Sequence, residues 1–301
     1  MGFLYMPIEP DRKKQYDLHK AANVKDYPSL LMDWFHMKTG YRFDLQNPIT
    51  FNEKIQWLKL FGNIERYTDL TDKLKVRSYV GSRIGEQYLV PLLGVWDNFQ
   101  DINFKVLPKK FMLKCNHGCE MNTVINNQSL YGIRLIKKEF EEWLNINFAF
   151  FNGFELQYKN ICPKLFAEQY IENNKDNLDD YKVWCFNGIP KYIMYMTNRN
   201  NELQELLFDT EWNKQFFIPN NKKQKPAIDK PDNLSEILNI SATLSEGIPF
   251  VRIDLYRLND GTIKFGEMTF TPASGTFRWN PVQWDQTLGN LLTLPKYEKV
   301  R

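Results

Sequence analysis

The chain has 301 residues, of which 43% are hydrophobic and 15% are aromatic, so it is large enough to fold around a substantial core in two or three lobes. This composition excludes a largely disordered protein. The formal net charge is only +3 and basic residues alternate with acidic ones, which argues against nucleic acid as a partner. No apolar run approaches the ~20 residues of a membrane-spanning helix, so we expect no transmembrane segment and a cytoplasmic protein.

The N-terminal region has a helical pattern over residues 27–83, in which apolar residues recur near helical spacing. Thr50 is followed three residues later by Glu53, which is the pattern of a capping box at the start of a helix. A second helix is expected over residues 71–79, which would place Lys73 and Arg77 on one side. A solvated charged surface explains the same pattern of charges.

Residues 106–175 have the pattern of a mixed lobe. Short apolar runs typical of strands occupy residues 111–115, 123–125 and 165–171, and residues 130–148 have the spacing of an amphipathic helix. The first two strands are joined by the polar loop Asn116-His117-Gly118-Cys119-Glu120-Met121-Asn122. The expected order is therefore strand, polar loop, strand, helix and strand.

The four cysteines are expected to be free thiols, because a chain of this size in a reducing compartment does not need a disulfide framework. Cys115 and Cys119 flank His117 and could form part of a zinc site. No second pair of Cys or His follows at zinc-finger spacing. Packing or loop roles are therefore the favoured interpretation of these residues.

The C-terminal part begins with a predicted hairpin, because Asn187-Gly188 is a turn dipeptide between strand-like runs at 181–184 and 191–196. Residues 173–180 and the basic stretch 222–233 are expected to be loops. A helix is expected over residues 234–246, ending at Gly247 and Pro249.

A second hairpin carries the candidate metal site. Residues 250–258 and 262–270 are strand-like, and Asp260-Gly261 is a strong signal for a two-residue turn. Counting outward from that turn places Asp254 directly opposite Glu267, and Arg252 directly opposite Thr269, with all four side chains on one face.

Two opposed carboxylates repel each other unless a cation lies between them or one of them is protonated. Magnesium is the favoured cation because it takes oxygen ligands and is commonly held by one or two carboxylates together with substrate phosphates. An exposed polar sheet face is the alternative interpretation, because another loop length would separate Asp254 from Glu267.

The order of these features, with a lysine-bearing strand and glycine-containing loop followed by a late pair of metal-binding strands, resembles the ATP-grasp superfamily. More closely, residues 41–295 resemble the teichuronopeptide-synthesis (TupA-like) ATP-grasp family of bacterial surface-polysaccharide enzymes. The stretches that carry the resemblance are TFNEKIQW at 50–57, DK at 72–73, LKCNHG at 113–118, DYK at 180–182, RIDLY at 252–256 and FGEMTFTP at 265–272.

The resemblance implies an α+β ATP-grasp fold in which ATP is held between two α+β lobes. The implied boundaries are a mainly helical N-terminal lobe at 1–105, an ATP-grasp lobe with the phosphate loop and hinge strand at 106–175, and a C-terminal ATP-grasp lobe with the magnesium hairpin at 176–301.

The resemblance also assigns roles to individual residues. The implied phosphate contacts are Lys73, Lys114, Lys182, His117 and Gly118; the adenine-binding hinge strand is Glu168, Gln169, Tyr170 and Ile171; Asp180 lies near the ribose; Asp254, Glu267 and Thr269 hold Mg²⁺; and the catalytic groups are Lys114, Lys182 and Arg252. The chain departs from its relatives at Cys119-Glu120-Met121, where they commonly carry more glycine, and at Thr269, where many ATP-grasp enzymes have Asn.

The implied activity is ATP-dependent ligation of a carboxylate to an amine through an acyl phosphate. The expected substrates are small molecules, in particular a sugar acid or an amino compound of capsule, O-antigen or cell-wall polysaccharide synthesis. A small-molecule or sugar kinase, a glycosyltransferase and a non-catalytic nucleotide-binding partner in polysaccharide assembly are the alternatives. A catalytic Cys119 is a further, weaker alternative.

Overall fold

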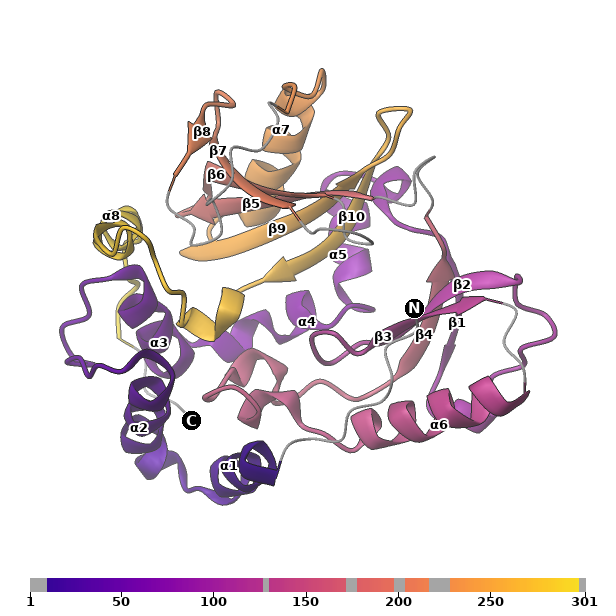
Figure 1. Cartoon of the computed structure of the whole chain (residues 1–301), viewed down its shortest axis with the longest axis horizontal. Coiled ribbons are helices and arrows are strands. Elements are labelled where there is room, and N and C mark those ends of the chain that lie inside the picture. Colours follow the sequence, from indigo (N-terminus) through magenta and orange to yellow (C-terminus); the bar gives the residue numbers. More distant parts are fainter. Residues whose placement is uncertain (1–9, 127–129, 172–177, 198–203, 217–227, 298–301) are drawn as a thin grey trace.

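The structure is a computed structural model that describes residues 10–126, 130–171, 178–197, 204–216 and 228–297. Two antiparallel sheets and a group of N-terminal helices make up the fold (Figure 1), which confirms the expected α+β class. The helices are α1 Pro10–Ala21, α2 Tyr27–Thr39, α3 Phe51–Phe61, α4 Thr68–Thr71, α5 Val76–Arg83, α6 Leu130–Leu144, α7 Leu234–Ser245 and α8 Gln283–Leu291. The strands are β1 Leu92–Trp96, β2 Lys110–Cys115, β3 Asn122–Asn126, β4 Leu165–Gln169, β5 Asp179–Phe186, β6 Ile189–Thr197, β7 Gln204–Asp209, β8 Lys214–Gln215, β9 Phe250–Arg257 and β10 Ile263–Thr269.

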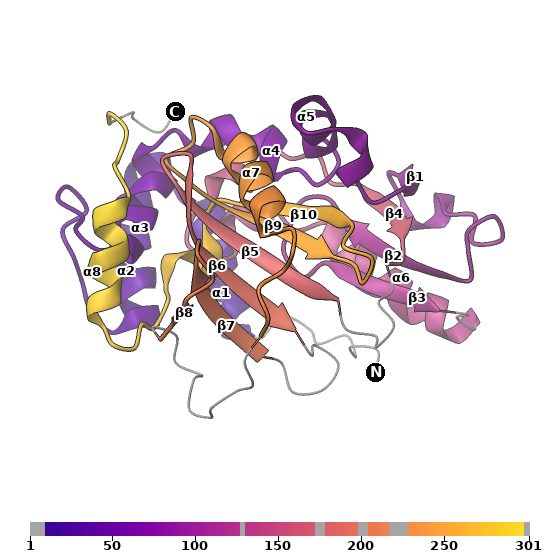
Figure 2. The same cartoon turned by 90° about the horizontal axis from the view of Figure 1, so that it is seen from above.

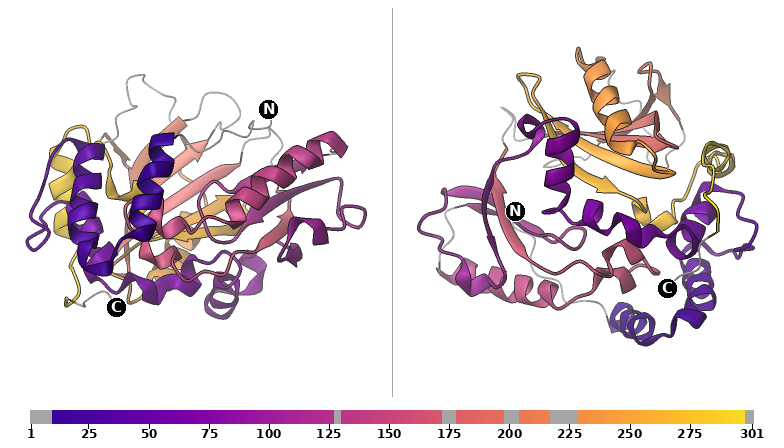
Figure 3. Two further views of the ribbon diagram at one scale, coloured as in Figure 1. Left: turned by 90° about the horizontal axis from the view of Figure 1, so that it is seen from below. Right: turned by 180° about the vertical axis from the view of Figure 1, so that it is seen from behind.

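Helices α1, α2 and α3 lie at one end of the molecule, away from the small sheet, in both views of Figure 3. The capping box at the start of α3 is confirmed: the Thr50 hydroxyl accepts from Glu53 N at 3.3 Å, and the Glu53 carboxylate accepts from Thr50 N at 3.1 Å. Since each partner satisfies a backbone N–H that the helix leaves unpaired, the pair fixes where α3 begins. None of the described helices is both long and apolar enough to cross a membrane.

The expected helix over residues 71–79 is wrong in its extent. The chain leaves helical geometry at Asp72, and α5 starts only at Val76. The physical reason is that the Asp72 carboxylate accepts from Leu74 N at 2.8 Å and from Lys75 N at 3.3 Å, which replaces backbone acceptors at this point. Lys73 is therefore placed on a short connecting segment.

The small sheet has the order β1-β4-β2-β3. The three predicted strands of this lobe are present as β2, β3 and β4, although β4 ends at Gln169 and leaves Tyr170 and Ile171 of the predicted hinge strand outside it. The predicted helix is α6, which ends at Leu144 instead of residue 148 and lies along the sheet in Figure 1. β1, which was not expected, comes from the part of the chain assigned to the helical lobe and pairs antiparallel with β4. The sheet brings Lys114 of β2 beside β4, with Lys114 paired to Phe166.

The large sheet has the order β10-β9-β5-β6-β7-β8, and α7 packs on one of its faces (Figure 2). The predicted β5–β6 hairpin is confirmed, with Asn187 at φ 51° and Gly188 at φ 78°, the left-handed geometry that such a tight turn requires. The predicted helix α7 and its stop at Gly247, with φ 72°, are also confirmed. Of the predicted loops at 173–180 and 222–233, residues 173–177 and 222–227 lie outside the described residues. The first prediction is wrong at its end, because β5 already begins at Asp179.

An aromatic cluster fixes α3 against the large sheet. The ring of Phe51, at the start of α3, lies 5.4 Å from that of Trp184 on β5 and 4.9 Å from that of Phe250 on β9. Phe186 and Trp279 complete the same buried cluster. Because interiors are closely packed, this cluster fixes α3 relative to the strands that carry the candidate site.

Candidate active site

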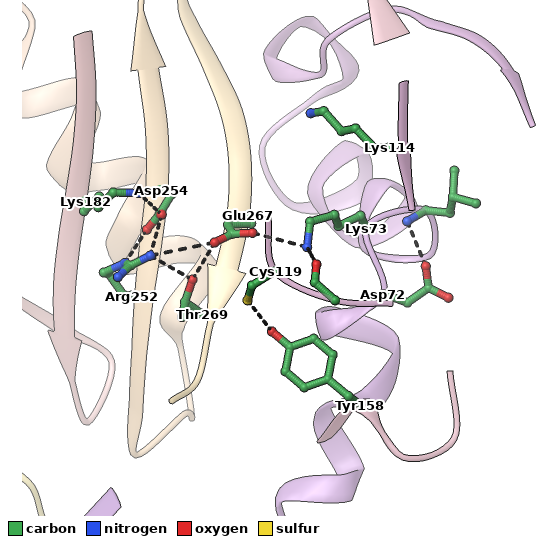
Figure 4. A network of polar contacts seen from close by, with 12 residues as sticks. Asp72, Lys73, Lys114, Cys119, Tyr158, Lys182, Arg252, Asp254, Glu267 and Thr269 are labelled. Atoms are coloured by element: carbon green, nitrogen blue, oxygen red, sulfur yellow. Dashed lines mark hydrogen bonds and ion pairs between the residues drawn. The ribbon is translucent and has the colours of Figure 1, made fainter. Parts of the chain in front are cut away.

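The two predicted pairs on the β9–β10 hairpin are confirmed. Glu267 is the cross-strand partner of Asp254, and Thr269 is the partner of Arg252. In Figure 4 these four side chains gather on one side of the hairpin. The two carboxylates are therefore neighbours in the folded protein, as the candidate metal site requires.

The path to this pairing differs from the predicted one. The expected two-residue turn at Asp260-Gly261 is wrong, because Leu258 N bonds Thr262 O at 2.8 Å and the loop comprises residues 259–261. That extra loop residue shifts the register by one. A bulge between Phe265 and Glu267 shifts it back, and the intended partners meet.

Asp254 lies at the centre of the network and is almost completely buried, with 2% of its side chain exposed. Arg252 donates to both carboxylate oxygens, through Nε to Oδ1 and through Nη2 to Oδ2, each at 2.7 Å. Lys182 of β5, its cross-strand partner on the other side, donates to Oδ2 and also lies 3.0 Å from Asp180. A row of Lys182, Asp254 and Glu267 thus crosses three neighbouring strands.

Glu267 is the more open of the two acids, with 29% of its side chain exposed. Its Oε1 accepts from the Thr269 hydroxyl at 3.0 Å and lies 3.7 Å from the Arg252 guanidinium. Burial by itself would raise the pKa of Glu267, but Lys73, Lys182 and Arg252 outweigh it and hold the pKa at about 2. Glu267 is therefore an anionic oxygen donor near neutral pH.

Lys73 links the large sheet to the polar loop of the small sheet. Its ammonium lies 3.3 Å from Glu267 Oε2 and donates to the carbonyl of Gly118, in the polar loop, at 2.7 Å. Its backbone N donates to Asn116 O at 3.1 Å. Burial lowers the pKa of Lys73, but Glu267 more than compensates, so the pKa is raised and the side chain stays charged.

Lys114 belongs to a second ion-pair group, on the small sheet. Its ammonium lies 2.7 Å from Glu168 Oε2 on β4, and the other oxygen of Glu168 lies 2.9 Å from Arg77 Nη1 of α5. Glu168 therefore sits between two cations and is only 9% exposed. The Glu168 carboxylate thus holds the Lys114 ammonium on the sheet. A phosphate group that binds Lys114 would compete with this carboxylate for the ammonium.

The remaining cofactor-binding candidates occupy different surroundings. The His117 ring is buried, with Nε2 3.0 Å from Trp143 O, so the imidazole is engaged on the α6 side. A side chain at Gly118 would meet Met121 and Phe148 at less than 3 Å. Gln169 N donates to Pro91 O at 3.0 Å, and the Tyr170 ring lies under Lys110, 4.1 Å away. Nucleotide contacts by these residues and by Ile171 stay predictions.

The donor set fits a magnesium ion. Asp254, Glu267 and Thr269 offer oxygen atoms only, which is the chemistry that Mg²⁺ prefers. Within the described ranges, no group of three or more His, Cys, Asp or Glu side chains forms a metal site on its own. Two carboxylates match an ion that takes its other ligands from phosphates and water.

The structure also shows site residues that the sequence interpretation missed. Asn116 donates to Asp72 Oδ1 at 3.0 Å and accepts from Lys164 N at 2.7 Å, so it holds the segment that carries Lys73. Arg77 was seen only as part of a charged surface, yet it shares Glu168 with Lys114. Asn116 stands inside the matched stretch at 113–118, which was the available signal for it.

The cysteines of the polar loop have structural surroundings. Burial raises the pKa of Cys115, and that of Cys119 to about 12, which disfavours the thiolate that a nucleophile or zinc ligand requires. The Cys119 thiol lies 3.3 Å from the Tyr158 hydroxyl.

Residues 53–293 match the model of a protein family described as TupA-like ATPgrasp. No curated protein matches the chain. Among solved structures it is similar to D-alanine–D-alanine ligase from Bacillus anthracis complexed with ATP, with 15% identity and a TM-score of 0.43 over 77% of this chain and 66% of that one. It is also similar to L-amino acid ligase from Bacillus licheniformis, with 14% identity and a TM-score of 0.44 over 77% and 51% of the two chains. The chain thus spans about half to two thirds of the length of these proteins.

Proposed function

Because the chain belongs to the TupA-like ATP-grasp family, we propose that it is an ATP-dependent carboxylate–amine ligase that uses Mg²⁺. The observation that carries the proposal is the row of Lys182, Asp254 and Glu267 across three strands, reached from the other lobe by Lys73. Opposed carboxylates surrounded by lysines and an arginine suit a magnesium ion and the phosphates of a nucleotide.

In this proposal each group acts on charge. Asp254 and Glu267 hold the magnesium ion, with Thr269 supporting Glu267 through its hydroxyl. When bound, the ion neutralises phosphate oxygens during transfer. Lys73, Lys114 and Lys182 bind phosphate oxygens as point charges.

Arg252 has a separate role beside the transferred group. Its guanidinium is held by Asp254 through two 2.7 Å bonds, so it is oriented before substrate arrives. Burial by itself would lower the pKa of Arg252, but the nearby carboxylate of Asp254 raises it by more. The net pKa is therefore raised and the cation persists. A fixed cation at this place stabilises the charge that develops on the phosphoryl group.

The reaction has two steps. A substrate carboxylate oxygen attacks the γ-phosphorus of ATP; the new P–O bond forms as the bond to the bridging oxygen breaks and ADP leaves. An amine then attacks the acyl carbon, the C–O bond to phosphate breaks, the nitrogen loses a proton, and an amide and phosphate are released. No protein nucleophile is required, so the raised pKa of Cys119 is no obstacle.

The family also suggests the substrates. We place the enzyme in the cytoplasm, acting on a sugar acid or amino acid during the synthesis of capsule, O-antigen or cell-wall polysaccharide. The hinge residues Glu168–Ile171 would bind adenine and Asp180 the ribose, in line with the family pattern. Both substrates are small molecules in this proposal.

The test is a matrix of uronic acids against amino acids and amino sugars, with ATP and Mg²⁺ present, in which ADP, phosphate and product mass are followed. The ligase proposal requires ADP and phosphate to appear only when a carboxylate and an amine are supplied together, with an amide as the other product. A stable phosphorylated product formed without regard to the amine would assign the protein to the kinases instead.

A further inference from the structure

Helix α3 carries polar residues where a helix packed in the core would normally be apolar. Asn52, Gln56 and Lys59 are exposed by only 2%, 0% and 1%. Their spacing of four and three residues places them along one face of the helix. A buried polar group is costly unless it is hydrogen-bonded, and a buried lysine especially so. These three side chains must therefore have hydrogen-bond partners inside the protein.

The partners belong to a turn with unusual backbone geometry. The segment Pro272–Gly275 follows β10, and Ala273 at φ 47° and Ser274 at φ 53° both lie in the left-handed region, as does Gly275 at φ 68°. Residues with a Cβ are destabilised in that conformation by a close approach of the Cβ to the following carbonyl oxygen. Such a turn persists only where its surroundings hold it.

The polar face of α3 supplies that support. Lys59 Nζ donates to Ser274 O at 2.8 Å, and Gln56 Nε2 donates to Ser274 O at 3.1 Å and to Gly275 O at 2.8 Å. Asn52 bonds both backbone groups of Phe277, donating to its O at 2.8 Å and accepting from its N at 3.1 Å. The carbonyl groups of Ser274 and Gly275 are thus hydrogen-bonded by α3.

A second set of contacts holds the start of the turn at Thr271. The Thr271 hydroxyl donates to the buried Glu155 carboxylate and accepts from Gln157 at 2.8 Å. Burial lowers the pKa of Lys59 to about 7, although the charge of Glu155 opposes this shift. The neutral amine of Lys59 still has two N–H groups, so donation to Ser274 O does not require the charged form.

The turn is directly continuous with the strand that carries the candidate metal ligand. Glu267 and Thr269 belong to β10, and Thr271 begins the anchored segment two residues after that strand ends. β10 is an edge strand with β9 as its neighbour. Its far end therefore depends on the turn for its position.

We propose that Lys59, Gln56 and Asn52 are positioning residues that hold the left-handed turn and, through it, fix β10 so that Glu267 stays opposite Asp254. The inference rests on the proposed function for what Glu267 binds. On this interpretation the N-terminal helices form part of the machinery that aligns the metal site.

The chain contains a matched control on the same helix. Lys54 is also a partly buried lysine of α3, and its Nζ donates to two carbonyls, Gly289 O and Leu292 O, each at 2.8 Å. These carbonyls belong to α8 and to the residue after it, which lie beyond the turn in the chain and outside the segment that connects β10 to the turn. Lys54→Met therefore removes the same kind of bond without touching the turn.

The first measurement is hydrogen exchange of the full-length Lys59→Met and Lys54→Met variants without ligand. In Lys59→Met we expect amides of residues 263–276 to exchange about tenfold faster, because Ser274 O loses its lysine donor, while β5 and β6 keep their protection. In Lys54→Met residues 263–276 should exchange as in the wild type. Equal acceleration over all strands, or none in 263–276, would show that Lys59 only stabilises the fold.

The second measurement is calorimetry with a non-hydrolysable ATP analogue, with and without Mg²⁺. The dissociation constant without Mg²⁺ divided by that with Mg²⁺ measures the enhancement by the metal. This ratio should fall about tenfold in Lys59→Met and stay unchanged in Lys54→Met. A ratio unchanged in Lys59→Met would overturn the link to the metal site. A wild-type protein without any Mg²⁺ dependence would instead defeat the proposed function, and the exchange experiment would still decide whether Lys59 positions β10. If Lys59→Met does not fold, Lys59→Gln replaces it in both measurements, because glutamine is shorter but still polar.

Discussion

Lys73 Nζ lies 3.3 Å from Glu267 Oε2, and this ion pair connects the segment between α4 and α5 with the edge strand of the large sheet (Figure 4). The lysine also bonds Gly118 O in the polar loop of the small sheet. One side chain thus touches the loop expected to cover phosphates and the acid expected to hold magnesium. That is the arrangement needed for a nucleotide to be bound by both lobes at once.

The first prediction concerns the metal. Asp254→Asn should abolish most of the enhancement by Mg²⁺ of ATP-analogue binding, because a neutral amide is a weaker ligand and leaves Glu267 without its partner. Calorimetry with and without Mg²⁺ measures this. Asp260→Asn, in the loop of the same hairpin, is the control and should keep the enhancement, since its carboxylate is exposed and caps Thr262 N. Equal metal dependence in both variants would remove Asp254 from the site.

The second prediction concerns Lys114. Replacing it with Met should lower the rate of ADP formation by ~10²-fold, the typical effect of losing one charge-stabilising contact in an active site. Lys137→Met on α6 is the matched control, because Lys137 forms an exposed pair with Glu141 at 3.5 Å and such pairs contribute little. Rates that differ from wild type by the same factor in both variants would contradict a phosphate role for Lys114.

The third prediction separates the charge of Arg252 from its shape. Arg252→Lys keeps a cation but loses the two-point bond to Asp254, so kcat should fall by more than tenfold while KM for ATP changes little. Steady-state kinetics in the ligation assay gives both constants. A rise in KM with kcat preserved would mean that Arg252 binds ATP in the ground state and does not favour the transition state.

The fourth prediction is a pH dependence of stability. Because the pKa of Glu267 is about 2 in the folded protein and 4.5 is its ordinary value, the unfolded chain binds a proton in this interval and the folded protein does not. Stability from Glu267 is therefore complete above about pH 4.5 and is lost as the pH falls toward 2. Urea unfolding of wild type and Glu267→Gln should give a difference that shrinks steadily over this window. A constant difference would show that its carboxylate is not ionically stabilised.

Local signals account for much of what the sequence predicted correctly. The capping box of Thr50 and Glu53, the Asn187-Gly188 turn and the end of α7 at Gly247 each depend on residues within a few positions of one another. Such features form from local hydrogen bonds and backbone geometry, so their patterns are legible in the chain.

Contacts between distant segments were not predictable in this way. Lys59 and its partner Ser274 are 215 positions apart, and nothing near Lys59 indicates that a left-handed turn will need its ammonium. Likewise β1 pairs with β4 across about seventy residues, so its short sequence gave no sign of a partner. The polar face of α3 looked like an ordinary amphipathic helix for the same reason.

The pairing of Asp254 with Glu267 was correct although the turn behind it was not. The loop of residues 259–261 is one residue longer than expected, and the one-residue bulge at Gly266 compensates for it. Loop length and bulge are separate features, and a glycine inside a strand is the kind of residue at which bulges form. The metal-site geometry therefore depends on Gly266.

The last prediction tests that dependence. A Cβ at Gly266 would lie 3.0 Å from Asp254 O and 3.2 Å from the Tyr256 ring, so in Gly266→Ala these neighbours must shift by a few tenths of an ångström at the bulge. Overpacking of this kind typically costs 1–3 kcal/mol, and here the displacement falls beside Glu267. We expect Gly266→Ala to fold with a modest loss of stability in urea and to lose most of the Mg²⁺ enhancement of nucleotide binding. Gly40→Ala is the control: it is strained at φ 85° but contacts nothing within 4 Å, so it should lose stability without affecting metal dependence. If Gly266→Ala kept the full metal effect, the bulge would not be what aligns the two carboxylates.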